Sequence, residues 1–458
     1  MALPGLNFDA IKLPLQEKQT VVHELKSNTE WRFEVSFERS IEVKLLSGTA
    51  EIFGTELAQN QLEPYVFRGA KAAIYTWHGC KLEVTGSCSV DYIAEETPMI
   101  SYGNTHFALE ALREDAVASN TLGPRVLVVG PANAGKTSLA KLLSAYAYRS
   151  GRTPVVANLD PKEGFLTIPG TISASALESI VDVSQGWGSS PITGPSQIPT
   201  KLPLVYQYGL EDPDAKPDNF KAIVRRLALS VNNRLEDDSN AKSTGCIIDT
   251  AGSMSNGREN YGIIQHIVSE FQVNVLIILG SERLYSDMFR RFSKPGVSIL
   301  KLDKSGGCVD RDVTYLQQAR DTQVKEYFFG SPQSMLSPHS QQISFDEVLI
   351  YRVSSESSDF LDSLLPGDDE YTSSSDKIFE KLDEPTSMMQ NATLAIVQAE
   401  PTDTPETVRD SSVIGFVFIS EVDDKRRKIR MLTPMTGRLP KKVLIWGTFP
   451  EPVANLLG

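Results

Sequence analysis

One short glycine-rich stretch constrains this 458-residue chain more than any other part of it. Residues 130–137 read Gly-Pro-Ala-Asn-Ala-Gly-Lys-Thr and fit the phosphate-binding pattern G-x-x-x-x-G-K-[ST]. The apolar run 125–129 before it is typical of a buried parallel strand, and leucines at helical spacing follow it. Strand, loop and helix in this order predict a P-loop, whose glycines let backbone N–H groups close around phosphate oxygens. An ordinary glycine-rich turn is the alternative, but all four fixed positions and both flanks are present.

The residues of this loop that would hold a nucleotide follow from the pattern. Lys136 is expected to reach the β- and γ-phosphates, and the Thr137 hydroxyl is expected to bind Mg²⁺. The neighbouring positions complete the predicted nucleotide site: Asn133, Ala134, Gly135 and Ser138. We therefore expect ATP and Mg²⁺ as ligands.

Net charge and cysteine use narrow the class of protein. A formal charge of −13 and a pI of about 5.1 argue against a general nucleic-acid binder, although they do not exclude a local basic groove. None of the four cysteines forms a C-x-x-C pair, which is typical of reduced thiols in a cytosolic or nuclear protein. The N-terminal residues lack the pattern of a signal peptide, and the longest uninterrupted apolar run, Val275 to Leu279, is too short to cross a bilayer.

Three domains are predicted from the pattern of strands and helices. Residues 1–101 contain short alternating strands separated by turn residues, as in a small β-sandwich or barrel. Residues 102–331 alternate strand and helix, which predicts a mainly parallel sheet covered by helices. Residues 332–458 are mostly β, with a Ser-rich acidic insertion at about 354–390 that we expect to be disordered. The predicted fold class is α/β, with a central P-loop NTPase domain between two β domains.

Two carboxylates follow strands of the predicted central sheet, at the edge where ligands of such folds bind. Asp160 comes 24 residues after Lys136 and is suited to bind Mg²⁺ through water or to accept a proton from an attacking hydroxyl. Asp249 ends the apolar run 246–248 and fits the pattern of a Walker B acid. The alternative for each is an aspartate that caps the turn after its strand.

Two basic segments have competing interpretations. Arg311, Arg320 and Lys325 follow the last central strand, and cations on a closing lid can stabilise charge during phosphoryl transfer. A solvated helix face is the alternative for these three residues. The run Lys425 to Lys428 is interpreted first as a charged hairpin and second as a nucleic-acid contact.

Further motifs, taken together with the P-loop, resemble the polyribonucleotide 5′-hydroxyl-kinase family. They are residues 47–57, 104–106, 158–160, 168–170, 304–307, 326–330 and 437–440. The resemblance runs almost end to end. It is strongest to a fungal branch of the family, the ATP-binding subunits of the mRNA cleavage and polyadenylation factor (cleavage factor IA).

The resemblance implies a nuclear subunit that binds ATP and Mg²⁺ and is required for pre-mRNA 3′-end cleavage and polyadenylation. Its main implied partner is the scaffold subunit that also binds the RNA polymerase II tail, together with other 3′-end processing subunits. RNA contact would be indirect or weak, and no membrane is involved. The resemblance also implies that Glu30 and Lys71, in the N-terminal domain, help to hold the nucleotide base.

Three positions depart from the pattern of the active members of that family. Ser253 stands where these members carry a Trp that stacks on the acceptor nucleotide, and Glu163 stands where they carry Gln. Lys325 replaces the second of two lid arginines and lacks the planar fork that clamps a phosphate.

These departures favour a protein that binds ATP as a structural ligand, with no catalytic residues expected. An active RNA 5′-hydroxyl kinase is the alternative. In that case Asp160 would deprotonate the 5′-hydroxyl, Lys136 would steady the γ-phosphoryl group and Arg320 would cap it. In either case Thr137 and Asp160, the latter through water, are the expected Mg²⁺ ligands.

Overall fold

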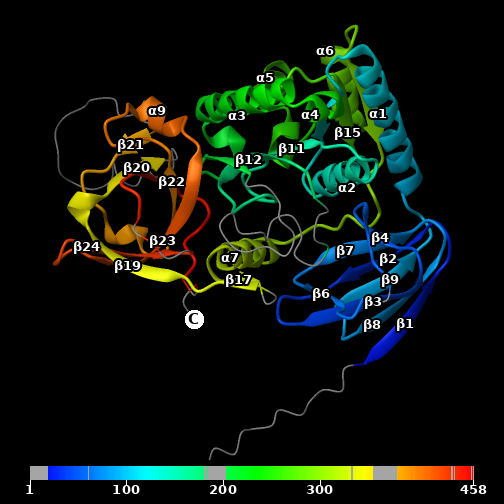
Figure 1. Cartoon of the computed structure of the whole chain (residues 1–458), viewed down its shortest axis with the longest axis horizontal. Coiled ribbons are helices and arrows are strands. Elements are labelled where there is room, and N and C mark those ends of the chain that lie inside the picture. Colours follow the sequence, from blue (N-terminus) through cyan, green and yellow to red (C-terminus); the bar gives the residue numbers. More distant parts are fainter. Residues whose placement is uncertain are drawn as a thin grey trace, which may run out of the picture. The chain divides into compact units, whose positions relative to one another are not determined.

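The computed structural model describes residues 19–59, 61–179, 183, 203–331, 334–353, 379–434, 437, 439–454 and 456. Contacts within the chain divide it into two compact units, which we describe separately. The smaller unit holds residues 1–50 and 56–95, and the larger holds residues 51–55 and 96–458. Figure 1 follows the chain from the N-terminal strands to the C-terminal sheet. The domain boundaries at 101 and 331 stay a prediction.

The N-terminal part of the chain is a β-sandwich, as predicted. Its two sheets have the strand orders β1-β8-β3-β6 and β5-β4-β7-β2-β9. The strands are β1 (Thr20–Leu25), β2 (Thr29–Glu34), β3 (Ser40–Gly48), β4 (Glu51–Ile52), β5 (Thr55–Glu56), β6 (Tyr65–Arg68), β7 (Lys71–Thr76), β8 (Cys80–Thr85) and β9 (Val90–Ala94). Trp31 stacks on Phe33 with ring centroids 4.6 Å apart, and both are buried. The polar residues that alternate with them, Glu30 and Arg32, are buried as well and form an ion pair with each other.

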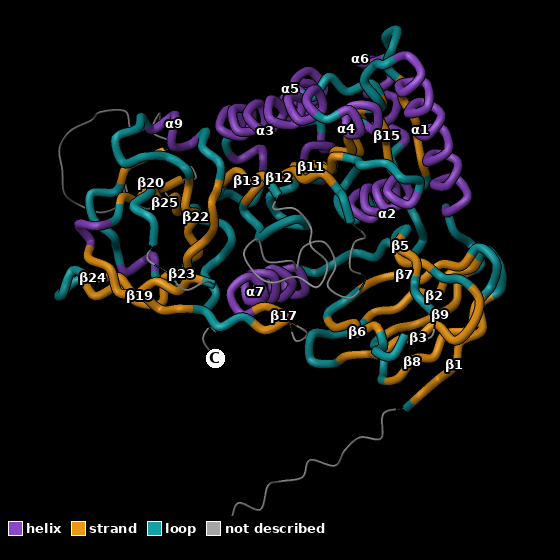
Figure 2. Tube along the Cα trace, viewed as in Figure 1, coloured by secondary structure: helices purple, strands orange, loops and turns teal. Residues whose placement is uncertain are grey.

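A seven-stranded sheet forms the centre of the larger unit, in the order β13-β12-β11-β14-β10-β15-β16. Figure 2 labels β13, β12, β11 and β15 of this sheet. Five strands are parallel, as predicted: β10 (Arg125–Val129), β11 (Val155–Leu159), β14 (Cys246–Thr250), β15 (Val275–Leu279) and β16 (Ser298–Leu302). Two antiparallel strands, β12 (Thr171–Ala176) and β13 (Leu204–Gln207), extend the sheet beyond β11. The sequence pattern did not indicate β12, because its residues are mainly small and polar and carry little of the apolar signal of a buried strand.

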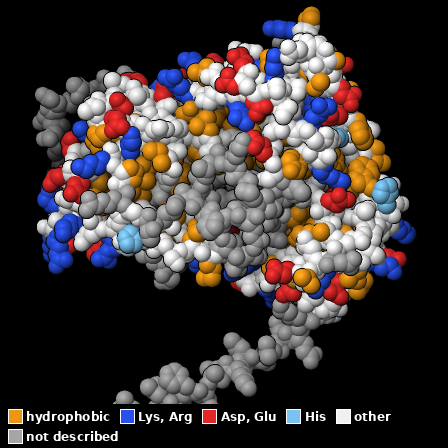
Figure 3. Space-filling view, viewed as in Figure 1, with side chains coloured by type: hydrophobic (Ala, Val, Ile, Leu, Met, Phe, Trp, Pro, Cys, Tyr) orange, Lys and Arg blue, Asp and Glu red, His pale blue; other side chains and the backbone are white. Residues whose placement is uncertain are grey.

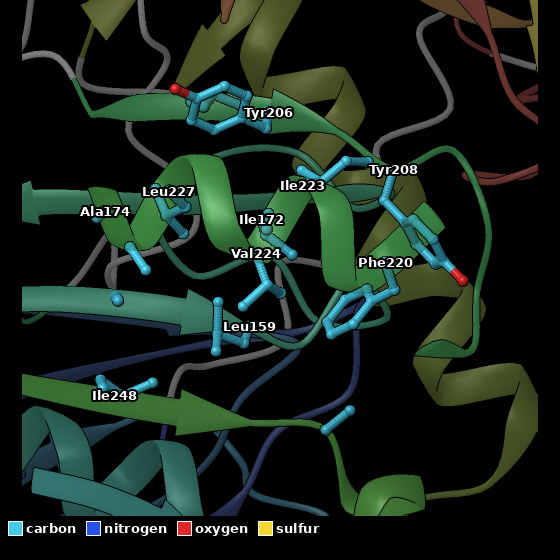
Figure 4. Close-up of a cluster of buried hydrophobic side chains, with 14 of the residues drawn as sticks. Leu159, Ile172, Ala174, Tyr206, Tyr208, Phe220, Ile223, Val224, Leu227 and Ile248 are labelled. Atoms are coloured by element: carbon cyan, nitrogen blue, oxygen red, sulfur yellow. The ribbon is translucent and has the colours of Figure 1, made fainter. Parts of the chain in front are cut away.

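Helices surround this sheet and connect its strands. They are α1 (Met99–Ser119), α2 (Lys136–Arg149), α3 (Pro217–Asp237), α4 (Ser239–Thr244), α5 (Gly262–Glu270), α6 (Glu282–Phe292) and α7 (Val313–Phe329). Phe220, Ile223, Val224 and Leu227 recur at helical spacing on α3 and are fully buried, in the cluster that also holds residues of β11, β12 and β13 (Figure 4). Among the described residues, no helix combines the length and the apolar character that crossing a bilayer requires.

The C-terminal part contains a second seven-stranded sheet, in the order β19-β24-β23-β22-β25-β20-β21. Its strands are β19 (His339–Ser344), β20 (Leu349–Val353), β21 (Phe379–Lys381), β22 (Thr393–Val397), β23 (Val413–Asp423), β24 (Lys428–Thr433) and β25 (Val443–Trp446). A short helix α9 (Pro405–Arg409) lies between β22 and β23, and the two-stranded β17 (Gly330–Ser331) and β18 (Ser334–Met335) follow α7. Tyr327 and Phe328 of α7 make edge-on contacts with Phe416 and Phe418 of β23, which fixes α7 to this sheet.

The basic run Lys425 to Lys428 lies at the turn between β23 and β24, so the interpretation as a charged hairpin is correct. Its charges are partly neutralised by acidic neighbours. Arg427 donates to Glu384, with Nη1 and Oε1 2.7 Å apart, and also contacts Asp346 at 3.4 Å. The Arg426 backbone N–H is capped by Asp423 at 3.0 Å.

The predicted acidic insertion ends earlier than residue 390. Residues 354–378 lie outside the described part of the chain. Phe379 begins β21, which pairs antiparallel with β20, and its ring stacks on Tyr351 at 4.8 Å. Met389 is fully buried. The prediction for residues 379–390 was therefore wrong, because two apolar anchors suffice to attach a segment whose average composition is polar.

Deletion of residues 356–376 is expected to leave the melting temperature within a few degrees of that of the full chain. Their composition is acidic and Ser-rich, so little buried apolar surface should be lost. Extending the deletion to residue 388 should lower the melting temperature clearly, because it removes β21 from the edge of the sheet. Thermal melts of the two deletion variants, followed side by side, test this boundary. Equal melting temperatures for both would contradict it.

Candidate functional site

The P-loop joins β10 to α2 and has the shape of a phosphate cradle. Gly135 has a φ of 88°, a left-handed conformation that favours glycine, and it caps the N-terminus of α2. A Cβ at Gly135 would lie 2.6 Å from the Cys308 Sγ, and one at Gly130 would lie 2.7 Å from the Leu279 carbonyl oxygen. Side chains at these positions would therefore fill the space around the loop. The free backbone N–H groups at the start of α2 make this a favourable place for an anion.

Lys136 and Thr137 lie at the start of α2, and the functional group of each donates a hydrogen bond. The Lys136 Nζ donates to the Pro131 carbonyl oxygen at 2.9 Å, so its amine lies over the loop. The Thr137 Oγ1 donates to the Asp249 Oδ2 at 2.5 Å. Burial raises the pKa of Asp249 to about 6, although Lys136 and the Thr137 hydroxyl favour its charged form. The other carboxylate oxygen, Oδ1, accepts from the Thr250 N–H at 3.0 Å, so Asp249 both contacts the P-loop threonine and caps its own turn, and its role as a Walker B acid stays a prediction.

Asp160 begins the loop that follows β11, and a buried asparagine shapes this loop. The Asn158 side chain donates to the carbonyl oxygens of Asp160 and Glu163 at 3.2 and 3.1 Å, and its Oδ1 accepts from the Asp160 N–H at 3.0 Å. The Asp160 Oδ1 caps the turn by accepting from the Lys162 N–H at 3.0 Å. Burial, reinforced by the nearby Glu163 carboxylate, raises the pKa of Asp160 to about 7. The sequence analysis assigned no structural role to Asn158. A polar Asn two residues before a candidate functional Asp was the signal that could have indicated this role.

Two further cations lie at this site: Arg311, which the sequence analysis named as one of three candidate lid cations, and Lys141, which the sequence did not indicate. Arg311 donates from Nη1 and Nη2 to the two Glu163 carboxylate oxygens at 2.7 and 2.5 Å, and from Nε to the Asn133 Oδ1 at 3.1 Å. Lys141 lies one helical turn after Thr137. Burial lowers its pKa to about 8, although Asp249 and Glu163 favour its charged form. A triphosphate with Mg²⁺ fits this set of donors, since it supplies the negative charge that the cations favour and the oxygen ligands that Mg²⁺ prefers.

The two predicted lid residues do not share one face of α7. Arg320 is buried, forms an ion pair with Glu451 and stacks its guanidinium 5.2 Å from the Phe449 ring. Lys325 is exposed and comes five residues later, which places it about 140° around the helix from Arg320. Arg320 is held here by the C-terminal segment, and the role of the two residues as lid cations stays a prediction.

Ser253 lies in the turn after β14, next to the P-loop. A Cβ at Gly252 would come within 2.6 Å of the Ala132 backbone nitrogen, and the Ser255 Oγ donates to the Gly130 carbonyl oxygen at 2.9 Å. Ser253 itself is half-buried. This segment therefore packs directly on the P-loop backbone and offers a hydroxyl where an aromatic ring was expected for an active enzyme.

The remaining predicted nucleotide-site residues lie in two places. Ala134 is fully buried within the loop and Ser138 is half-buried in the first turn of α2. Glu30 and Lys71 belong to the N-terminal unit. Each forms an ion pair there, Glu30 with Arg32 and Lys71 with Glu34, the latter with Nζ and Oε2 2.9 Å apart.

Comparison with known proteins identifies relatives of the whole chain. Three family models match: the mRNA cleavage and polyadenylation factor CLP1 P-loop over residues 130–330, the N-terminal β-sandwich domain of polyadenylation factor over 24–116, and the pre-mRNA cleavage complex II protein Clp1 over 336–451. A protein of Botryotinia fuckeliana named mRNA cleavage and polyadenylation factor clp1 is 52% identical, with both chains covered in full. One of the same name from Phaeosphaeria nodorum is 49% identical, again with full coverage.

Two solved structures resemble the chain over most of its length. One is a wild-type Clp1p–Pcf11p complex, with a TM-score of 0.84, 30% sequence identity, and 94% of this chain and 98% of that chain covered. The other concerns an extended interface between Pcf11p and Clp1p and the structural basis for ATP loss in a point mutant, with the same TM-score and identity and 94% and 99% coverage.

Proposed function

The chain belongs to the family of the mRNA cleavage and polyadenylation factor Clp1, and on this premise we propose that it is an ATP-binding subunit of a nuclear complex for pre-mRNA 3′-end cleavage and polyadenylation. In this proposal ATP is a structural ligand that is held and not used to phosphorylate RNA. Relatives that carry the factor's name over their full length support the complex, and the Clp1p structure that concerns loss of ATP supports the nucleotide.

The observation that carries the ATP proposal is the pair of engaged side chains at the start of α2. Lys136 lies over the cradle, and the Thr137 Oγ1 lies 2.5 Å from the Asp249 Oδ2. We propose that the nucleotide phosphates are held by Lys136 and by the loop positions that the sequence indicated: Asn133, Ala134, Gly135, Thr137 and Ser138. Thr137, with Asp160 through water, would hold Mg²⁺, which neutralises phosphate charge when bound. Glu30 and Lys71 would help to hold the base.

The proposal that ATP is not transferred rests on the acceptor side of the site. Ser253 offers no ring for stacking a nucleotide, Arg320 is paired with Glu451, and Lys325 is exposed on another face of α7. Phosphoryl transfer depends mainly on positioning of the acceptor and on preorganised charge. The loss of the stacking ring and of the lid arginine is therefore expected to remove most of the rate of transfer to RNA. Asp160 near Lys136 is the feature that favours the alternative, an active RNA 5′-hydroxyl kinase.

For the partner, we propose the scaffold subunit of the same factor. The related Clp1p structures, in which Clp1p forms an interface with Pcf11p, support a protein partner. Direct RNA contact is proposed to be weak. The net charge of −13 and the acidic partners of the β23–β24 hairpin support this. Where described residues are visible in Figure 3, basic and acidic side chains are interspersed on the surface.

Incubation of the purified protein with γ-labelled ATP, Mg²⁺ and a 5′-hydroxyl RNA is expected to transfer no label above background. The reason is the missing ring and lid arginine described above. The variant carrying both Ser253→Trp and Lys325→Arg is the companion measurement, and measurable transfer by it would identify those two positions as the cause. Robust transfer by the unmodified protein that disappears in Asp160→Asn would instead establish the kinase.

A further inference from the structure

An ion pair joins two segments that follow strands on opposite sides of β10, the strand that leads into the P-loop. Glu163 belongs to the loop after β11, and Arg311 belongs to the segment between β16 and α7, 148 residues further along the chain. The pair is bidentate, with the two guanidinium nitrogens 2.7 and 2.5 Å from the two carboxylate oxygens. This geometry is the strongest that an Arg and a carboxylate form.

Both partners of the pair are held in place by other contacts. The Glu163 backbone carbonyl accepts from the Asn158 side chain at 3.1 Å, so a buried residue holds the loop that carries Glu163. The Arg311 Nε donates to the Asn133 Oδ1, and Asn133 in turn contacts Asp310 at 3.4 Å. Asn133 is a P-loop residue in the left-handed region, with a φ of 54°. The pair is therefore tied to the phosphate cradle itself.

The segment that carries Arg311 also approaches the second glycine of the cradle. Cys308, three residues before Arg311, has its Sγ where a Cβ on Gly135 would collide with it. Residues 308–311 therefore contact the P-loop at two residues, Asn133 and Gly135, and Arg311 is also paired with Glu163. We call residues 308–311 the strap.

The charges of the pair are matched and partly shielded from water. About a quarter to a third of each side chain is exposed, 27% for Arg311 and 30% for Glu163, so the interaction is less screened than that of a surface pair. Burial alone would raise the pKa of Glu163, but the hydrogen bonds from Arg311 hold that pKa below its ordinary value. Glu163 is thus charged at neutral pH, as a bidentate pair requires.

We propose that Glu163 and Arg311 form a latch across the P-loop that slows the release of a bound nucleoside triphosphate. This inference rests on the proposed function, because it requires ATP in the cradle. A nucleotide that leaves must move the strap of residues 308–311 away from Asn133 and Gly135. The ion pair opposes this movement, since breaking it would leave Glu163 facing the Asp160 carboxylate without its counter-charge.

A different role for Arg311 predicts the opposite effect of one substitution. If Arg311 instead acted as a direct phosphate ligand, Glu163 would compete with the nucleotide for its guanidinium. Removing the Glu163 charge would then slow release or leave it unchanged. In a latch, removing either charge speeds release, and removing both does no more than removing one.

The test first removes bound nucleotide from the full-length protein with EDTA and then loads it with α-labelled ATP and Mg²⁺. An excess of unlabelled ATP is added, and the label that stays bound is followed over time. Glu163→Gln and Arg311→Gln are each expected to release ATP about 3- to 30-fold faster than the unmodified protein. The double variant should release no faster than the faster single variant. Glu178→Gln is the matched control, because Glu178 pairs with Arg234 at 3.2 Å and is 33% exposed, and its release rate should not change.

Each outcome has a distinct meaning. Release from Glu163→Gln at or below the unmodified rate overturns the latch, whatever Arg311→Gln does. Because Glu163→Gln preserves size and shape, it decides the question even where Arg311→Gln fails to fold. Additive effects in the double variant also overturn the latch. An unmodified protein that takes up no ATP overturns the proposed function and the latch with it, whereas variants that retain ATP as firmly as the unmodified protein overturn the latch alone.

Discussion

Replacing Lys136 by Ala is expected to leave the purified protein largely free of ATP. The lysine amine lies over the phosphate cradle, and a charge-assisted hydrogen bond to a phosphate contributes about 1.5–3 kcal/mol. Losing it should weaken binding roughly 10- to 150-fold, since each 1.4 kcal/mol is a factor of ten. Nucleotide released by acid from equal amounts of the two proteins, separated by ion-exchange chromatography, measures the effect.

The control for this substitution is Lys242→Ala, on α4. Lys242 contacts Asn120 at 3.3 Å on the surface, and its loss should leave the bound nucleotide unchanged. Because a ligand stabilises the state that binds it, Lys136→Ala should also lower the melting temperature, and excess ATP should restore it only in part. Full retention of ATP by Lys136→Ala would mean that the P-loop is not where the nucleotide is held.

The second large effect is expected from Gly447→Val, in the segment that follows β25. A Cβ at Gly447 would lie 2.3 Å from both the Cα and the carbonyl oxygen of Gly209, a separation that requires the backbone to move. Overpacking typically costs about 1–3 kcal/mol and occasionally more, and a clash with backbone atoms places this substitution at the upper end. We expect a strong loss of stability, measured by thermal or urea unfolding, because the 447–451 segment ties the C-terminal sheet to the loops beside Asp160.

Hydrogen bonds connect the segment after β25 and the loops beside Asp160, so a shift at Gly447 is expected to reach the nucleotide site. The Phe449 N–H donates to the Gly209 carbonyl oxygen at 3.1 Å, and the Gly170 N–H donates to the Pro161 carbonyl oxygen at 2.8 Å, directly after Asp160. Gly447→Val is therefore expected to weaken ATP retention as well. The adjacent Thr448→Val is the control, since Thr448 is exposed and the same side chain should be tolerated there. Equal unfolding midpoints for the two variants would contradict the packing described here.

The central sheet and the P-loop could be predicted from the sequence because their signals are local. Apolar β-branched runs such as Val126 to Val129 have one stable place in an α/β fold, and the phosphate-binding pattern fixes the turn that follows. Strand β12 could not be predicted, since its position at the antiparallel end of the sheet depends on pairing with β11 and β13. Local propensity does not contain this pairing.

Some residues of the candidate site could also be predicted from the sequence and others could not. Lys136, Thr137 and Asp160 lie within or directly after elements whose spacing is readable, and the structure brings them together with Asp249. Arg311 and Arg320 could not be assigned from spacing, because which one faces the P-loop depends on Glu163 and Glu451, both more than 100 residues away from their partners. Long-range charge pairing of this kind is visible only in the folded chain.

The proposal that ATP is a retained structural ligand is tested by the nucleotide content of the purified protein. Protein held with Mg²⁺ at working temperature for hours, then denatured in acid, should release close to one adenine nucleotide per chain, and that nucleotide should still be ATP. Protein that is folded but releases no nucleotide, or that releases mainly ADP formed during the incubation, would contradict the claim.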